Sequence, residues 1–233
     1  MDKKELKTNS TDIITSWVSA VVGMIPVVGG VVSELVQNLI PNQRQDRIVK
    51  FIESLSNELD KIKFDIAELR QKFENVKYGT FTYDCLKSVV NNVYDEKIEY
   101  YKKLCLNAIT EDEKNLIHCE RILKILEQLD YYEILYLIFY EKCNTIGPSE
   151  MRQSLYDKLG FDILQPSYYI GMQIEQRDEE TYKQITLNNL CNTGLLDMEV
   201  KYNSSGRNPR TTYKITTLGR LVLRKIGELE WIN

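Results

Sequence analysis

The sequence predicts a mainly α-helical protein, with a long antiparallel helical hairpin or bundle followed by a winged-helix domain that contains a small β-hairpin. Apolar residues recur at heptad spacing from Ile48 to Val76. In the last third of the chain, helical patterns surround two short alternating segments joined by a turn-rich stretch. We therefore expect an apolar helical hairpin at residues 1–41, a heptad hairpin at residues 42–120 and the winged-helix domain at residues 121–233.

The first expected element is the apolar segment near the N-terminus. Twenty-one consecutive residues, Ile13 to Ser33, carry no formal charge, in a chain in which 27% of the residues are charged. One helix of this length would reach roughly 30 Å, the thickness of a bilayer's hydrocarbon core. Pro26 removes a backbone hydrogen bond in mid-helix, so two short helices are expected instead. The side chains predicted to contact a membrane or a partner are Trp17, Val21, Val22, Ile25, Val27, Val28, Val31 and Val32.

Two alternative locations remain for this segment. It inserts into the inner membrane with Trp17 at the interface, or residues 13–40 fold back and bury themselves against the long helices. In the first case three basic residues would lie at the cytoplasmic surface, Arg44, Arg47 and Lys50. Five cysteines without a CxxC spacing are typical of a reducing compartment. We therefore expect a cytoplasmic protein, either peripheral to the inner membrane or inserted in it through this segment.

The second expected element is a helix of about 35 residues. Pro41 precedes it and Gly79 follows it, as is typical of helix boundaries. We expect it to turn at Lys77–Thr82 and to pair with the next helical segment; a coiled-coil homodimer or a partner protein bound along Ile48–Val76 is the alternative. The seam comprises Ile48, Ile52, Leu55, Leu59, Ile62, Ile66, Leu69, Phe73 and Val76.

The remaining elements follow from caps, turns and alternation. Thr110 with Glu113 resembles a capping box that opens a helix, and an apolar face runs from Ile122 to Tyr140. Helices are expected at Ser149–Leu159, at Thr181–Leu190 and at Leu218–Leu229. The strands of the hairpin are marked by Met198, Val200 and Tyr202, and by Tyr213 and Ile215.

Enzymatic chemistry is hard to assemble from these residues. His118 is the single histidine, and its neighbour Cys119 points to a different helix face. The glycines at positions 23, 29 and 30 lack the lysine and hydroxyl residue of a phosphate-binding loop. We therefore predict a non-enzymatic protein with no catalytic residue, no metal site, no cofactor and no small-molecule substrate.

The C-terminal region is basic in an acidic chain of net charge −4. The predicted winged helix could use these cations to contact the phosphates of double-stranded DNA, although residues 178–180 are acidic and would repel phosphate. The alternative is a scaffold whose basic face balances acidic helices or docks on a partner. The predicted nucleic-acid-binding or partner-binding residues are Lys201, Arg207, Arg210, Lys214, Arg220, Arg224 and Lys225.

Residues 85–229 resemble bacterial abortive-infection alpha-type proteins. The phrases that carry the resemblance are Ile122 to Leu126 with Leu129, Leu187 to Leu190 with Gly194 to Leu196, and Tyr213, Ile215, Thr216, Leu218 and Gly219. Residues 25–55 are similar to the opening of small bacterial proteins suspected of phage defence. The resemblance implies a role in limiting phage by harming the infected host, and it supplies no catalytic residue.

The expected function is accordingly phage defence by a non-enzymatic protein, in which the apolar segment engages a membrane or a partner and the winged-helix domain docks or senses. A winged-helix transcriptional regulator that dimerises through the heptad helix is the alternative. A helical pore-forming toxin is a third hypothesis, for which the expected secretion signal is missing.

Overall fold

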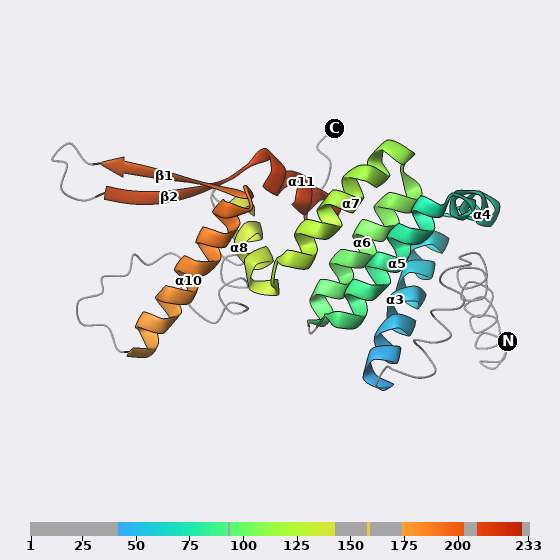
Figure 1. The fold of residues 1–233 in the computed structure, drawn as a ribbon, viewed down its shortest axis with the longest axis horizontal. Helices are drawn as coiled ribbons and strands as arrows, with labels where there is room; N and C mark the ends of the chain where they lie inside the picture. The colour runs from blue at the N-terminus through green and yellow to red at the C-terminus, as the bar shows by residue number, and fades with distance from the viewer. Residues whose placement is uncertain (1–41, 93, 143–157, 159–173, 203–208, 230–233) are drawn as a thin grey trace. The chain divides into compact units, whose positions relative to one another are not determined.

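The computed structural model describes residues 42–92, 94–142, 158, 174–202 and 209–229 (Figure 1). The apolar segment Ile13–Ser33, with all its predicted membrane or partner contacts from Trp17 to Val32, lies outside the described residues. So do most of the helix predicted at Ser149–Leu159 and the wing tip with Arg207. In the part of the chain that is described, no helix is both long enough and apolar enough to cross a membrane.

The chain divides into two compact units, Met1–Lys124 and Ile125–Asn233. The described part of the first unit is helical and contains α3 (Asn42–Lys61), α4 (Ile66–Glu74), α5 (Val76–Asn91), α6 (Asp95–Thr110) and most of α7 (Glu113–Gln128). Helices α3, α5 and α6 pack on one another side by side (Figure 1). Their shared core excludes solvent almost completely, and it includes Phe51, Leu59, Val89 and Leu104.

The long heptad helix is a wrong prediction, because the chain breaks twice within it. After α3 the backbone reverses at Lys63, which has a left-handed φ of 53°, and Asp65 then caps α4 by accepting a hydrogen bond from the amide of Ala67 at 2.9 Å. Two of the predicted seam residues, Ile62 and Val76, are exposed at these breaks. A short polar side chain that bonds a nearby amide competes with helix continuation, and the apolar spacing alone does not report this competition.

Asn75 makes the second break, and it serves both of the helices that it separates. Its backbone amide donates to the carbonyl of Lys72 at 3.0 Å, which ends α4, and its side-chain oxygen accepts from the amide of Lys77 at 3.1 Å, which begins α5. The turn predicted at Lys77–Thr82 is therefore wrong, since these residues lie inside α5. Gly79 is buried in that helix and does not end it. The reversal toward α6 comes later, after Asn91.

The capping box predicted at Thr110 is also wrong. Thr110 is the last residue of α6, and its hydroxyl donates to the carbonyl of Leu106 at 2.9 Å. Asp112 opens α7 instead, because its carboxylate accepts from the amide of Asn115 at 3.0 Å. This cap, two residues later than predicted, satisfies a free amide at the start of α7.

A further unpredicted cap, at Asp130, divides the apolar face of Ile122–Tyr140 into two helices. Helix α7 ends at Gln128, and α8 (Tyr131–Lys142) begins after Asp130. The side chains of Asp130 and Glu133 bond each other's backbone amides, at 2.7 and 2.8 Å. This reciprocal pair is a capping box with aspartate in the first position.

The second unit combines α8, α10 (Ile174–Asn192), a hairpin of β1 (Leu196–Tyr202) and β2 (Pro209–Ile215), and α11 (Thr217–Lys225). The predicted hairpin is confirmed, with antiparallel register partners that include Met198 and Tyr213. The helix predicted at Thr181–Leu190 starts earlier, at Ile174. The last helix ends at Lys225 rather than at Leu229, and Gly227 follows it with a left-handed φ of 78°.

A tight corner joins the hairpin to α11. The Thr216 hydroxyl accepts from the amide of Gly219 at 3.0 Å and donates to the carbonyl of Gly194 at 2.7 Å. A side chain at position 219 would place its Cβ atom 2.5 Å from the carbonyl oxygen of Leu195. Only glycine fits this approach, so the start of α11 is held against the base of β1.

Candidate functional site

Two of the predicted basic residues of the C-terminal region are held by carboxylates within the second unit. Lys214 on β2 lies 2.8 Å from Glu199 on β1, and this hydrogen bond and charge raise the pKa of the Lys214 ammonium. The Nε atom of Arg220 donates to both carboxylate oxygens of Glu141, at 2.9 and 3.0 Å, and so joins α11 to α8. These cations face acidic partners of the same unit.

The other predicted cations of this region do not add a described, freely exposed positive surface. Lys225 is buried, and Arg224 is half-buried. The side chains of Lys201 and Arg210, and the whole of Arg207, lie outside the described residues. Where the structure describes the predicted basic patch, it therefore brings these residues into ion pairs and into the interior rather than into one open face.

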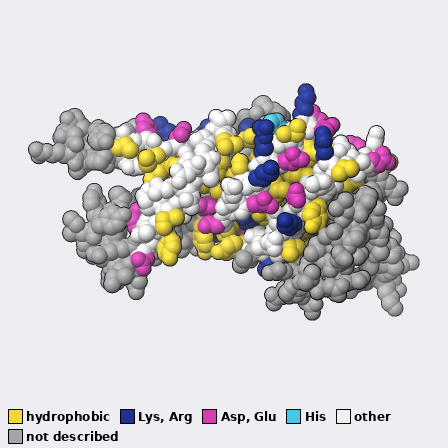
Figure 2. Space-filling view, in the orientation of Figure 1, with side chains coloured by type: hydrophobic (Ala, Val, Ile, Leu, Met, Phe, Trp, Pro, Cys, Tyr) yellow, Lys and Arg dark blue, Asp and Glu magenta, His cyan; other side chains and the backbone are white. Residues whose placement is uncertain are grey.

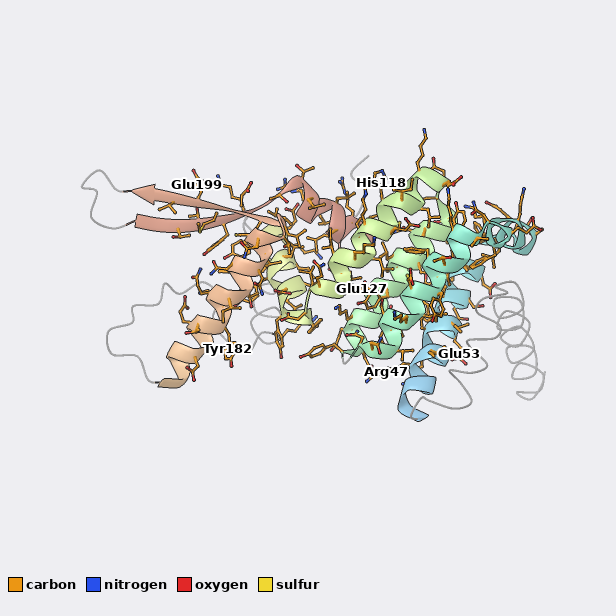
Figure 3. All side chains as sticks on the ribbon, viewed as in Figure 1. Arg47, Glu53, His118, Glu127, Tyr182 and Glu199 are labelled. Carbon is orange, nitrogen blue, oxygen red and sulfur yellow. The ribbon has the colours of Figure 1, made fainter. Side chains whose placement is uncertain are left out.

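The solvent face of α10 has a different character. Tyr182, labelled on α10 in Figure 3, is 69% exposed, and Ile185, three residues later, is 50% exposed. They belong to an exposed row at spacings of four and three, which comprises Asp178, Tyr182, Ile185, Asn189 and Asn192. We call these five residues the α10 row. The opposite face of the helix carries Leu187 and Leu190, which are buried in the second unit.

Polar contacts fix the flanks of α10. The side-chain amide of Gln184 donates to the hydroxyl of Tyr213 on β2 at 3.0 Å and to the side chain of Asn188 at 3.1 Å. Lys183 lies 3.5 Å from Glu180 on the same helix. The bond between Gln184 and Tyr213 holds α10 against the hairpin. The α10 row is therefore a pre-arranged surface.

Aromatic side chains of α8 pack against the hairpin, and α8 also contacts α10. The ring centroids of Tyr140 on α8 and Tyr213 on β2 are 5.8 Å apart. Burial raises the pKa of the Tyr136 and Tyr140 hydroxyls, because an ionised phenolate loses its hydration in this interior. These phenols therefore stay neutral and act as packing groups.

The hairpin adds a second apolar surface. Met198 and Val200 lie two residues apart on β1, so both point to the same face of the hairpin, and both are exposed. Hydrophobic side chains reach the molecular surface over β1 and β2 (Figure 2). Exposed apolar side chains that gather in this way are more typical of interaction surfaces than of a solvated face.

His118 and the described cysteines are side chains with potential for nucleophilic or metal-binding chemistry. The described residues contain no group of three or more histidine, cysteine, aspartate or glutamate residues able to hold a metal ion. His118 is exposed on α7, and its neighbour Cys119 is buried. Burial, followed by the hydrogen bond with Cys105, raises the pKa of the Cys85 thiol well above its usual range, so a reactive thiolate is disfavoured there.

Sequence reasoning missed Tyr182 and Ile185. Their signal was present as the regular spacing of the α10 row, but only two members of that row are apolar, and the nearby acidic and basic residues drew the interpretation toward nucleic acid. No protein-family model, no curated protein and no solved structure matches this chain.

Proposed function

We propose that this chain is a non-enzymatic protein of the abortive-infection type, whose second unit is a winged-helix-type module that docks on a partner protein through α10. The order helix, helix, two-stranded hairpin and helix in α8, α10, β1–β2 and α11 supports the winged-helix interpretation. The observation that carries the docking role is the exposure of Tyr182 and Ile185 on a helix whose flanks are fixed. Tyrosine is among the residues that most often anchor protein interfaces.

Charge favours a protein partner over DNA. Binding to a duplex depends on free lysine and arginine side chains that neutralise phosphates. On the described side chains of α10 the cation is Lys183, which lies against Glu180, and the exposed Asp178 would repel a phosphate. Lys214 and Arg220 are likewise engaged by Glu199 and Glu141. A phosphate would have to compete with these carboxylates for the cations.

The phage-defence role rests on the resemblance of residues 85–229 to abortive-infection alpha-type proteins. In this proposal the second unit docks on its partner, and the uncharged segment Ile13–Ser33 engages a membrane or a second partner when the protein acts. Host growth stops as a result, and the phage is limited.

Expression in a phage-challenged bacterial host tests the proposal. We expect the chain to reduce phage yield, and we expect both deletion of residues 1–41 and the double substitution Tyr182→Ser and Ile185→Ser to abolish this reduction. Ile62→Ser is the matched control, because Ile62 is also about half exposed, at 52%, but lies in the first unit. Full protection by the double variant at normal protein levels would exclude α10 as the docking element.

A gel-shift measurement on random-sequence duplex at low salt addresses the regulator alternative. We expect no shift at micromolar protein. A shift that disappears with Lys214→Gln and Arg220→Gln would instead assign the C-terminal cations to DNA and would contradict the docking proposal.

A further inference from the structure

Helices α3, α4, α5 and α6 of the first unit line a small, partly open cavity of about 20 Å³. Its wall is almost entirely apolar, with Phe51, Leu55 and Leu59 from α3 and with Leu69 and Phe73 from α4. A space of this size has room for about one water molecule, but a buried water needs at least two polar partners. Among the described residues the wall offers two hydroxyl groups, those of Ser56 on α3 and Thr82 on α5, so a water in the cavity would have to bond both of them.

Thr82 on α5 is one of the two hydroxyl-bearing residues in this wall, beside Ser56 on α3. Its side chain is 3% exposed, and within the described part of the chain its hydroxyl has no hydrogen-bond partner. Other helical hydroxyls of the same unit donate to the carbonyl four residues earlier, as Thr80 does to Val76 and Ser88 does to Asp84, each at 2.9 Å. Thr82 lacks this bond and lines the cavity instead. The Thr82 hydroxyl is thus buried at a mostly apolar wall without the bond that Thr80 and Ser88 make.

Helix α4 covers this cavity and is connected to the bundle in an unusual way. It has nine residues, and the buried side chains of Leu69 and Phe73 form its inner face. Lys63, at φ 53°, and the extended Asn75 interrupt the helical backbone on either side of it. A short helix between two such breaks can move as one body, because the rotation is absorbed at the breaks.

Lys72 is the polar attachment of α4. Its ammonium donates to the carbonyl oxygens of Ile109 and Glu111 at the end of α6, at 2.5 and 2.8 Å. It also lies 5.8 Å from the ring centroid of Phe64 and 5.6 Å from that of Tyr78. A cation at the C-terminus of a helix is favoured by the helix dipole, so this contact holds α4 closed.

We propose that the cavity is a binding site for a small, uncharged aliphatic molecule with one hydroxyl or carbonyl group. The ligand enters when α4 moves outward, its chain lies among Phe51, Leu59 and Phe73, and its polar atom bonds the hydroxyl of Thr82. An uncharged ligand fits because no charged side chain lines the cavity. The outward movement is required because the cavity is smaller than such a ligand. This site is independent of the docking role of α10.

Titration of the full chain with 1-hexanol, followed by amide chemical shifts, tests the assignment. We expect saturable binding with shifts that cluster on α4 and around Thr82. Thr82→Val keeps the shape of the side chain and removes the hydroxyl, and it should weaken binding about fivefold, as expected for the loss of one neutral hydrogen bond. Thr80→Val is the matched control on the same helix, and it should leave the affinity unchanged.

Stability without ligand shows that the variant is folded. Thr82→Val should raise the melting temperature, because it removes a buried hydroxyl that has no partner. Linear, non-saturating shifts, or equal affinities of the native chain and Thr82→Val, would overturn the site. Lys72→Met should speed association of 1-hexanol because it removes the attachment of α4. An unchanged association rate would overturn the assignment of α4 as the moving cover.

Discussion

Replacing Gly219 with alanine is expected to destabilise the second unit, although alanine normally favours a helix. Inside a helix, alanine gains about 1 kcal/mol over glycine. At this position, however, the new methyl carbon would lie 2.5 Å from the carbonyl oxygen of Leu195 and 2.7 Å from Cγ1 of Ile215. Overpacking against neighbours that cannot move typically costs about 1–3 kcal/mol. The balance of the two effects decides the sign.

Leu195 has little freedom to move away. Its carbonyl oxygen accepts from the backbone amide of Thr216 at 3.0 Å, and from the Thr216 hydroxyl at 3.2 Å as the weaker branch of a bond shared with the carbonyl of Gly194. A shift of this oxygen would weaken both bonds, so the upper part of the overpacking range applies. We expect Gly219→Ala to lower the free energy of unfolding by about 1–2 kcal/mol.

Urea denaturation of the full chain, followed by far-ultraviolet circular dichroism, measures this loss. Gly194→Ala is an informative comparison, because Gly194 has φ of 73° and a Cβ atom there would meet nothing within 4 Å. Its cost of about 1 kcal/mol should come from backbone conformation alone, and Gly194→Asn should recover most of it. Gly219→Asn should recover nothing. A Gly219→Ala variant as stable as the native chain would refute the close approach of α11 to β1.

Three further outcomes are expected. Asp130→Ala should cost about 1 kcal/mol of unfolding free energy, because it removes the capping interaction with Glu133 at the start of α8, and urea denaturation measures it. The Cys85 thiol should not react with a soluble disulfide reagent until the protein unfolds, because burial raises its pKa. Tyr136 and Tyr140 have pKa values raised above the ordinary 10.0, so their neutral forms stabilise the fold fully below pH 10. This contribution should fall as the pH rises beyond 10, and tyrosinate absorbance should show both groups ionising only with unfolding.

Much of the second unit could be predicted because its signals are local. Alternation at Met198 and Val200 marked a strand, and the glycine and polar residues that follow marked its turn. The first unit was harder, since heptad spacing predicted one helix where Asp65 and Asn75 divide it. A single capping bond is worth about 1 kcal/mol and is enough to decide between a continuous and a broken helix. Apolar spacing carries no information about such a bond.

The environment of the basic residues could not be read from the sequence. Arg220 and Glu141 are 79 positions apart, and their ion pair exists only because α11 and α8 pack together. A charge count over a segment treats each cation as free. The exposure of Tyr182 and Ile185 is likewise a property of packing, because it depends on which face of α10 the hairpin and α8 cover.

Asn75 has a consequence for how readily this protein can change shape. The Asn75 amide ends α4 and its side chain begins α5, so alanine at this position would remove the side-chain cap and favour an unbroken helix from Ile66 to Asn91. Straightening the chain here would pull Leu69 and Phe73 out of the core and leave them in water. The burial of these two side chains opposes straightening, and the Asn75 cap adds about 1 kcal/mol in favour of the closed bundle.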